Sequence, residues 1–276
     1  IVYFNICCLF CVEMELLHAC RLCGIDNAFE RATNVERALS ILNALPTMQD
    51  IHVRDSEQRT ALWHACDVGC VVLVERLLLA GGSWEDTDSS GWNTLHVCSD
   101  RGFAFILTKL LNHYQHANVT RPNRHYLHNL LSSRTSGPLW TPLHLASSSG
   151  HSKCVELLLA SGANVEDSTE DGWTALLLAS GASGNVKVVQ LLLSYSANAD
   201  VIDPVDGESC LHKACRSGSE DVAELLLSSG ATIKLDAAGV TPLCHALARG
   251  FDWNITVNRR NRHNVIHVED KDGEKT

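Results

Sequence analysis

The sequence predicts an all-α solenoid of about six helix-turn-helix repeats. Three observations support this fold class. A leucine, a small residue three positions later and a glycine seven positions later recur at intervals near 33 residues. A leucine-rich stretch follows each group, and an acidic, glycine-bearing connector comes next. No unit of this length can bury its own apolar face, so neighbouring units are expected to stack.

The recurring positions predict the first helix of each unit, in which the small residue allows close helix packing and the glycine ends the helix in the left-handed conformation. The leucines are Leu17, Leu62, Leu95, Leu143, Leu176, Leu211 and Leu243. The small residues are Cys20, Ala65, Cys98, Ala146, Ala179, Ala214 and Ala246. The glycines are Gly24, Gly69, Gly102, Gly150, Gly184, Gly218 and Gly250, with one inserted residue before Gly184.

A helix-start position precedes each leucine from Leu62 onward by two residues, and it carries a side chain that caps exposed backbone amides. These residues are Thr60, Asn93, Thr141, Thr174, Ser209 and Thr241, separated by 33, 48, 33, 35 and 32 positions. The second helix of each unit is predicted at the leucine runs 77–78, 110–111, 157–159, 191–193 and 225–227.

The stretch Thr141-Pro142-Leu143-His144-Leu145-Ala146 carries the head of this pattern in full. A Thr-Pro-Leu-His-x-Ala head with a period near 33 resembles the ankyrin repeat. The resemblance covers roughly residues 14–250. It implies an ankyrin-repeat solenoid whose connectors form short β-hairpin fingers. It also implies a protein-binding scaffold or adaptor, in which the concave face of first helices and the fingers hold the partner.

The repeat pattern divides the chain into four parts. Residues 1–13 form an apolar run that is too short to span a membrane and is of doubtful reality in the native protein. Residues 14–56 are expected to form a degenerate N-terminal capping repeat, and residues 57–250 the regular array. Residues 119–138 are a basic insertion, expected to protrude on the finger side. Residues 251–276 lack a leucine-rich second helix and are predicted to be a poorly ordered tail.

Composition limits the class of partner. The 276 residues carry a formal net charge of −10, which disfavours general binding to nucleic acid or anionic membranes. We expect a monomer with a protein partner and without membrane insertion. The twelve cysteines are scattered through apolar helical positions, so small buried thiols in a reducing compartment explain most of them. The expected location is the cytoplasm, with the nucleus as the alternative.

Catalytic motifs of the hydrolase, phosphate-loop and zinc-protease types are absent from the sequence. His96, His144 and His212 recur at one repeat position, where a hydrogen bond to nearby backbone would stabilise the turn. The sequence therefore predicts a protein that is not an enzyme and needs no cofactor.

Zinc is the metal alternative. Cys8, Cys11, Cys20 and Cys23 form two C-x-x-C pairs, a spacing that can hold a tetrahedral ion. Only eight residues separate the pairs, and Cys20 fills the small-residue position, so burial between helices is the favoured interpretation and no metal site is predicted.

Two sets of residues are the predicted partner-binding site. Trp92, Trp140 and Trp173 each directly precede a helix-start residue, and tryptophan is enriched where interfaces concentrate their energy. Local packing is the alternative role for them. The acidic set would steer a partner with a basic surface, although acidic connectors also serve solubility and turn formation. Its members are Asp86, Glu166, Asp167, Asp171 and Asp206.

Two further functions stay open. The array can be the substrate-recruiting region of a larger enzyme, such as a ubiquitin ligase receptor, a kinase or an acyltransferase. The basic insertion, with Arg121, Arg124 and Arg134, can instead contact nucleic acid or an acidic protein, or lie back across the acidic connectors and mask them.

Overall fold

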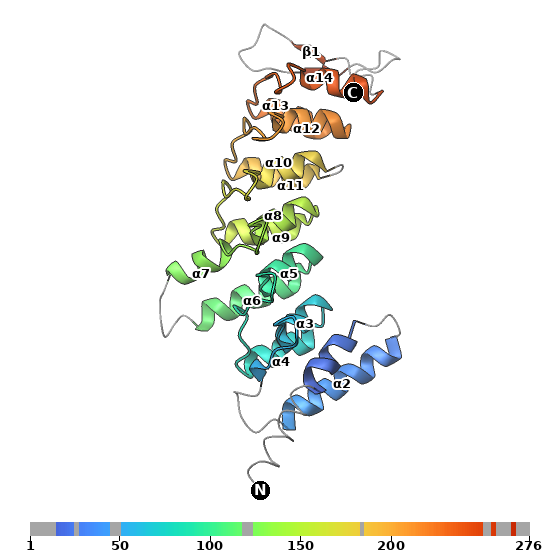
Figure 1. Cartoon of the computed structure of the whole chain (residues 1–276), viewed down its shortest axis with the longest axis vertical. Helices are drawn as coiled ribbons and strands as arrows, with labels where there is room; N and C mark the ends of the chain where they lie inside the picture. Colours follow the sequence, from blue (N-terminus) through green and yellow to red (C-terminus); the bar gives the residue numbers. More distant parts are fainter. Residues whose placement is uncertain are drawn as a thin grey trace. The chain divides into compact units, whose positions relative to one another are not determined.

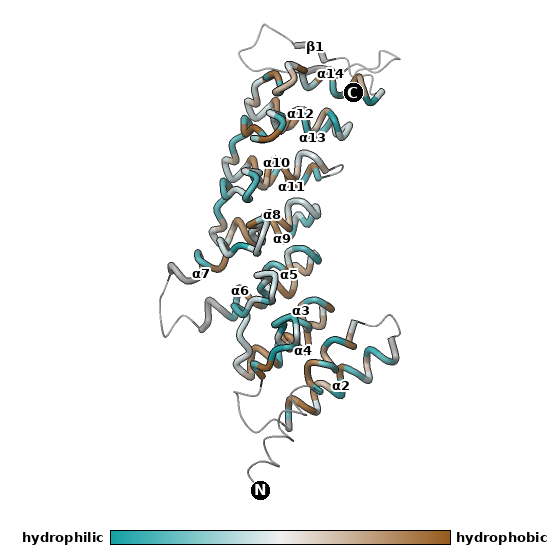
Figure 2. The backbone as a smooth tube through the Cα atoms, in the orientation of Figure 1, coloured by the Kyte–Doolittle hydropathy of each residue, from teal (hydrophilic) through white to brown (hydrophobic). Residues whose placement is uncertain are grey.

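The computed structural model describes residues 15–24, 28–44, 51–117, 124–182, 185–250, 255–257 and 266–268. The chain divides into two compact units, Ile1–Gly137 and Pro138–Thr276, and each is described by itself. Both are stacks of antiparallel helix pairs (Figure 1). Most hydrophobic segments lie in the helices, and most connectors are hydrophilic (Figure 2).

The first unit begins with a helix over residues 15–22. Helix α2 packs on α4, the first helix α3 packs on α5, and the second helix α4 packs on α6. The helices that follow residue 22 are α2 (Ala28–Ala44), α3 (Ala61–Asp67), α4 (Val71–Leu79), α5 (Thr94–Arg101), α6 (Ala104–Ala117) and α7 (Arg124–Leu131).

The second unit repeats the arrangement. First helices α8, α10, α12 and α14 pack on one another in this order, as do second helices α9, α11 and α13. Their bounds are α8 (Pro142–Ser148), α9 (Ser152–Ala160), α10 (Ala175–Gly181), α11 (Val186–Ser194), α12 (Cys210–Ser217), α13 (Glu220–Ser228) and α14 (Pro242–Ala248). Strands β1 (Ile255–Val257) and β2 (Ile266–Val268) follow as an antiparallel pair.

The core confirms the predicted positions. All seven small residues, from Cys20 to Ala246, have no exposed surface, and six of the seven leucines are buried. The exception is Leu243 in α14, which is half-buried. The second helices bury the leucine pairs that face the first helices, for example Leu158 and Leu159. The apolar spine is therefore built from equivalent residues of successive units.

The helix ends follow the predicted chemistry. Thr141 Oγ1 accepts a hydrogen bond from the His144 amide, and α5 ends at Gly102 in the left-handed conformation, with φ of 73°. Among the predicted glycines, Gly69, Gly150, Gly218 and Gly250 also have positive φ, whereas Gly184 lies outside the described residues. Gly24 does not share this conformation, in keeping with the degenerate first unit.

The fingers are tight turns. Within the fingers of the second unit, the described strand pairing consists of the bridges Ser168–Thr174 and Ile202–Ser209. Each finger is closed by a backbone bond, as from the Thr169 amide to the Trp173 carbonyl. Neighbouring fingers are also joined, since the Ala237 amide donates to the Asp206 carbonyl at 3.0 Å.

The described part of the insertion, which the sequence places on the finger side, contains α7. The last residue of this helix, Leu131, is buried, and Thr135 is buried as well. Ser133 Oγ accepts a hydrogen bond from the Asn93 side chain at 2.9 Å. Leu130 and Leu131, at the end of the helix, are both buried. Arg134 is exposed, whereas Arg121 lies outside the described residues.

Across the described parts of the chain, no helix combines the length and the apolar character needed to cross a bilayer.

Candidate functional site

The three repeated histidines have a structural role. In each, Nδ1 accepts the amide of the helix-start residue, so Nε2 carries the proton of a neutral ring. Nε2 then donates to a carbonyl farther along the chain in the same unit, which ties each first helix to the following segment. The acceptors are Ser133 for His96 (3.1 Å), Asp167 for His144 (2.8 Å) and Val240 for His212 (3.1 Å). These bonds confirm the backbone role that the sequence predicts.

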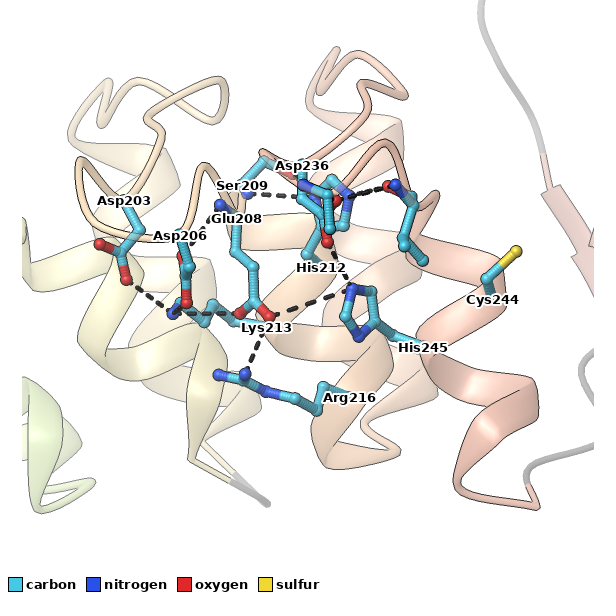
Figure 3. A network of polar contacts seen from close by, with 12 residues as sticks. Asp203, Asp206, Glu208, Ser209, His212, Lys213, Arg216, Asp236, Cys244 and His245 are labelled. Carbon is cyan, nitrogen blue, oxygen red and sulfur yellow. Dashed lines mark hydrogen bonds and ion pairs between the residues drawn. The ribbon is translucent and has the colours of Figure 1, made fainter.

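A buried ion cluster lies between α12 and the finger before it (Figure 3). Lys213 is only 3% exposed, and its ammonium lies 2.7 Å from Asp203 and 3.1 Å from both Asp206 and Glu208. The same ammonium stands 4.7 Å from the centre of the Trp173 ring, a cation–π contact. Buried charges persist when they are paired, so this cluster fixes the finger on its helix.

The pKa shifts agree with the pairing. Burial alone would lower the pKa of Lys213, but the hydrogen bonds to Asp203, Glu208 and Asp206 outweigh it and raise that pKa above its ordinary value. The pKa of Asp206 is lowered, because the Glu208 amide and Lys213 together outweigh the effect of burial. Both shifts favour the charged forms of Lys213 and Asp206.

Sequence reasoning missed Lys213. Val97, Leu145 and Leu178 occupy the equivalent position in other first helices, so a lysine there was a detectable departure from the repeat. Its significance depends on Asp203 and Glu208, and only the fold of the finger shows that these carboxylates turn inward.

A second group of side chains has the composition of a metal site. Ligand atoms of Glu208, Asp236 and His245 lie within 4.8 Å of one another. Glu208 is already paired with Lys213 and with Arg216 at 2.8 Å, and two adjacent cations oppose the binding of a divalent ion. The group is better described as the continuation of the ion cluster toward α14 (Figure 3).

Two of the predicted acidic residues are engaged within the protein. Asp86 pairs with Arg54 at 2.8 Å, in the first unit. Asp206, in the second, pairs with Lys213. Because their charges are partly neutralised, they contribute less to an external field than the sequence suggests.

The other three lie in one finger of the second unit. Glu166 and Asp171 are exposed, and Asp167 is half-buried. Glu166 accepts the Asn198 amide at 2.8 Å, and Asp167 accepts the Asn164 side chain at 2.9 Å. These donors are neutral, so the negative charges are retained. With Glu170, residues 164–172 carry four carboxylates, and none forms an ion pair within the described parts of the chain.

The predicted tryptophans are all half-buried. Trp92 belongs to the first unit, where its ring lies 6.3 Å from that of His96. Trp140 and Trp173 belong to the second. The Trp173 ring packs beneath Lys213, and its buried Nε1 has no hydrogen-bond partner. For Trp173, then, the geometry includes the local packing role that the sequence left as an alternative.

The described cysteines are free thiols in largely apolar surroundings. Cys20 and Cys23 are buried, as predicted for Cys20, whereas Cys8 and Cys11 lie outside the described residues. Burial raises the pKa of Cys20 strongly and that of Cys23 to about 11. Since a metal binds the thiolate, this environment disfavours the proposed zinc ligands.

A hollow of about 460 Å³ lies between the second helices α9 and α11. Its wall mixes signs of charge, and Lys153 is paired with Glu156 at 2.9 Å. The lining residues are Ser152, Lys153, Glu156, Lys187, Gln190, Leu191 and Ser194.

Comparison with known proteins now decides the family. The ankyrin-repeat family profile, in three copies, matches residues 29–123, 123–203 and 182–256. These matches cover most of the chain. The chain belongs to the ankyrin-repeat family. The repeated capping bonds and the stacked first and second helices described above are thus those of ankyrin repeats.

Three curated relatives resemble part of this ankyrin array. The probable E3 ubiquitin-protein ligase XBOS32 of Oryza sativa subsp. japonica is 31% identical over 48% of the chain and 30% of its own length. The E3 ubiquitin-protein ligase XBAT32 of Arabidopsis thaliana is 31% identical over 48% of the chain and 29% of its length. Glycerophosphocholine phosphodiesterase gde1 of Schizosaccharomyces pombe is 32% identical over 38% of the chain and 8% of its length. The chain thus spans under a third of these relatives.

Among solved structures, the ankyrin repeat domain of human ASB11 has a TM-score of 0.63 and 22% identity. The match covers 84% of the chain and 90% of that domain. It supports the all-α ankyrin solenoid. Ankyrin arrays mediate protein–protein interaction, so the comparisons and the fold both indicate a protein-binding role.

Proposed function

We propose that this ankyrin array is an adaptor that binds a protein with a basic surface through its fingers and the inner face of its first helices. The observation that carries the proposal is the finger at 164–172, whose four carboxylates have no cationic partner within the described residues. Charges that are not neutralised internally raise the local potential and steer an oppositely charged partner.

The remaining site residues take roles that follow from their surroundings. Trp92 and Trp140 are the proposed aromatic anchors, with Trp173 contributing mainly through its contact with Lys213. Asp86 in the first unit and Asp206 in the second are the weaker members of the acidic set, because each is paired within the protein. We propose that the chain acts as a monomer, without catalysis of its own, in the cytoplasm or nucleus, where its free thiols stay reduced.

The test is affinity capture with the full chain, followed by titration of each purified captured protein. The variant Glu170→Lys with Asp171→Lys reverses two exposed finger charges, and Glu224→Lys on α13 is the matched control. We expect the finger variant to lose at least about tenfold in affinity, and wild-type affinity to fall with added salt. Equal binding by all three proteins, or no saturable binding to any protein, would contradict the proposal.

A second candidate function rests on the names of two relatives, which are ubiquitin ligases. In that case the array recruits substrates for a larger enzyme. Sequencing the full-length transcript tests this candidate. A catalytic domain in the same reading frame supports it, and a complete reading frame that encodes repeats without such a domain rejects it.

A further inference from the structure

Two neighbouring fingers of the second unit expose aliphatic side chains. Val205 is 78% exposed, Leu235 62%, Ile233 48% and Ile202 42%. We call these four residues the fingertip patch. An isolated exposed aliphatic residue is ordinary, but several gathered on adjacent turns of a soluble protein mark an interaction site.

The patch follows the repeat register. Asp203 and Asp236 close their fingers by donating their amides to the carbonyls of Glu208 and Val240. Ile202 and Leu235 directly precede them, so they occupy the same position of consecutive fingers. The fingers are also tied together, because the Thr232 amide donates to Asp200 Oδ1 at 2.7 Å. Stacking therefore places the two aliphatic positions side by side.

The patch has an acidic finger on one side. The finger at 164–172 touches the finger of Ile202, since Glu166 Oε1 accepts the Asn198 amide. Its residue at the equivalent position is Ser168, with carboxylates on either side of it in the chain. Beside the patch, Asp200 and Asp206 each lie against a lysine, because Lys234 pairs with Asp200 at 3.8 Å and Lys213 pairs with Asp206, so their charges are partly neutralised. The surface therefore changes from apolar to strongly acidic along the stack.

We propose that the fingertip patch and the acidic finger together bind one extended segment of a partner protein, with aliphatic residues at one end and Lys or Arg at the other. Consecutive helix pairs stack about 10 Å apart, and an extended chain advances about 3.3 Å per residue. The segment thus carries two aliphatic residues about three positions apart and a basic residue about three positions farther on. This inference deepens the proposed function and rests on it.

The test is selection of short random displayed peptides on the full chain at low salt, followed by anisotropy titration of the enriched peptides. The patch variant is Ile202→Ser with Leu235→Ser. Its matched control is Leu79→Ser on α4, which removes an aliphatic side chain that is 74% exposed. We expect enriched peptides to share the aliphatic-to-basic spacing. The patch variant and the Glu170→Lys, Asp171→Lys variant should each weaken their binding at least about tenfold, and both controls less than about twofold.

Several results overturn the inference. The proposed binding surface is excluded if the enriched peptides are acidic or lack aliphatic residues. It is also excluded if they bind the patch variant as tightly as wild type, or if no peptide is enriched. If binding responds to the charge reversal but not to the patch variant, the proposed function survives and this inference fails. If affinity capture finds no protein partner either, both fail.

Discussion

At the residue scale, His212 shows how a repeat position controls protonation. Its Nδ1 accepts the Ser209 amide and its Nε2 donates to the Val240 carbonyl, an arrangement that needs the neutral ring. Burial lowers the pKa of His212 below its usual value, although Asp236 and Glu208 act in the opposite direction.

This lowered pKa predicts a pH dependence of stability. The unfolded chain takes up the proton near pH 6.5 and the folded one at a lower pH, so between these values unfolding is favoured by proton uptake. The contribution is complete above about pH 6.5 and is lost as the pH falls below it. Urea unfolding at pH 7.5 and 5.5 should show a smaller pH effect for His212→Gln than for wild type. An equal or larger pH effect in the variant would contradict this.

Substitution of Lys213 tests the buried ion cluster directly. Lys213→Met leaves Asp203 buried without its cation and leaves Glu208 paired with Arg216, which should cost about 3–5 kcal/mol of unfolding free energy. Asp206→Asn is the control, because this carboxylate is far more exposed and should cost less than about 1 kcal/mol. The raised pKa of Lys213 means that its contribution is present below about pH 10.5 and is lost as the pH rises through the folded value. Equal costs for the two variants in urea unfolding would show that the cluster does not hold the finger.

At the element scale, α7 is a helix that the sequence analysis does not predict within the basic insertion. The insertion reads as a basic connector, yet Leu131 is 2% exposed. Leu131→Ala should cost about 2–4 kcal/mol through lost burial and a cavity, whereas the exposed neighbour Asn129→Ala should be nearly neutral. Thermal and urea unfolding measure both. A neutral Leu131→Ala would contradict a stabilising role for this burial.

The helices of the array could be predicted because each depends on local chemistry. Three kinds of residue recur at a fixed spacing: helix caps such as Thr141, small residues such as Ala179 and helix-ending glycines such as Gly102. Each acts within its own repeat or on the adjacent one, so its role can be inferred from the spacing alone. The packing of Leu131 and the inward direction of Asp203 depend on contacts that no period encodes. For the same reason the repeat pattern does not distinguish acidic residues that face solvent, such as Glu166 and Asp171, from Asp206, which pairs with Lys213.

At the scale of the whole molecule, stability is expected to be a sum over neighbouring helix pairs. Helix α10 packs on a first helix on each side, α8 and α12. The first helix on which α14 packs is α12. Filling the buried small position should therefore cost more in the interior than at the end. Ala179→Leu is predicted to cost about 1–3 kcal/mol more than Ala246→Leu in urea unfolding. The reverse order would contradict additive stacking.

The proposed binding surface also depends on several repeats, because it joins fingers from three consecutive repeats of the second unit. Hydrogen exchange of the full chain, with and without a captured partner, tests this claim most directly. We predict slower amide exchange in residues 164–172, 198–208 and 231–241, and unchanged exchange in α9, α11 and α13. Protection confined to these second helices, with unchanged fingers, would contradict the account.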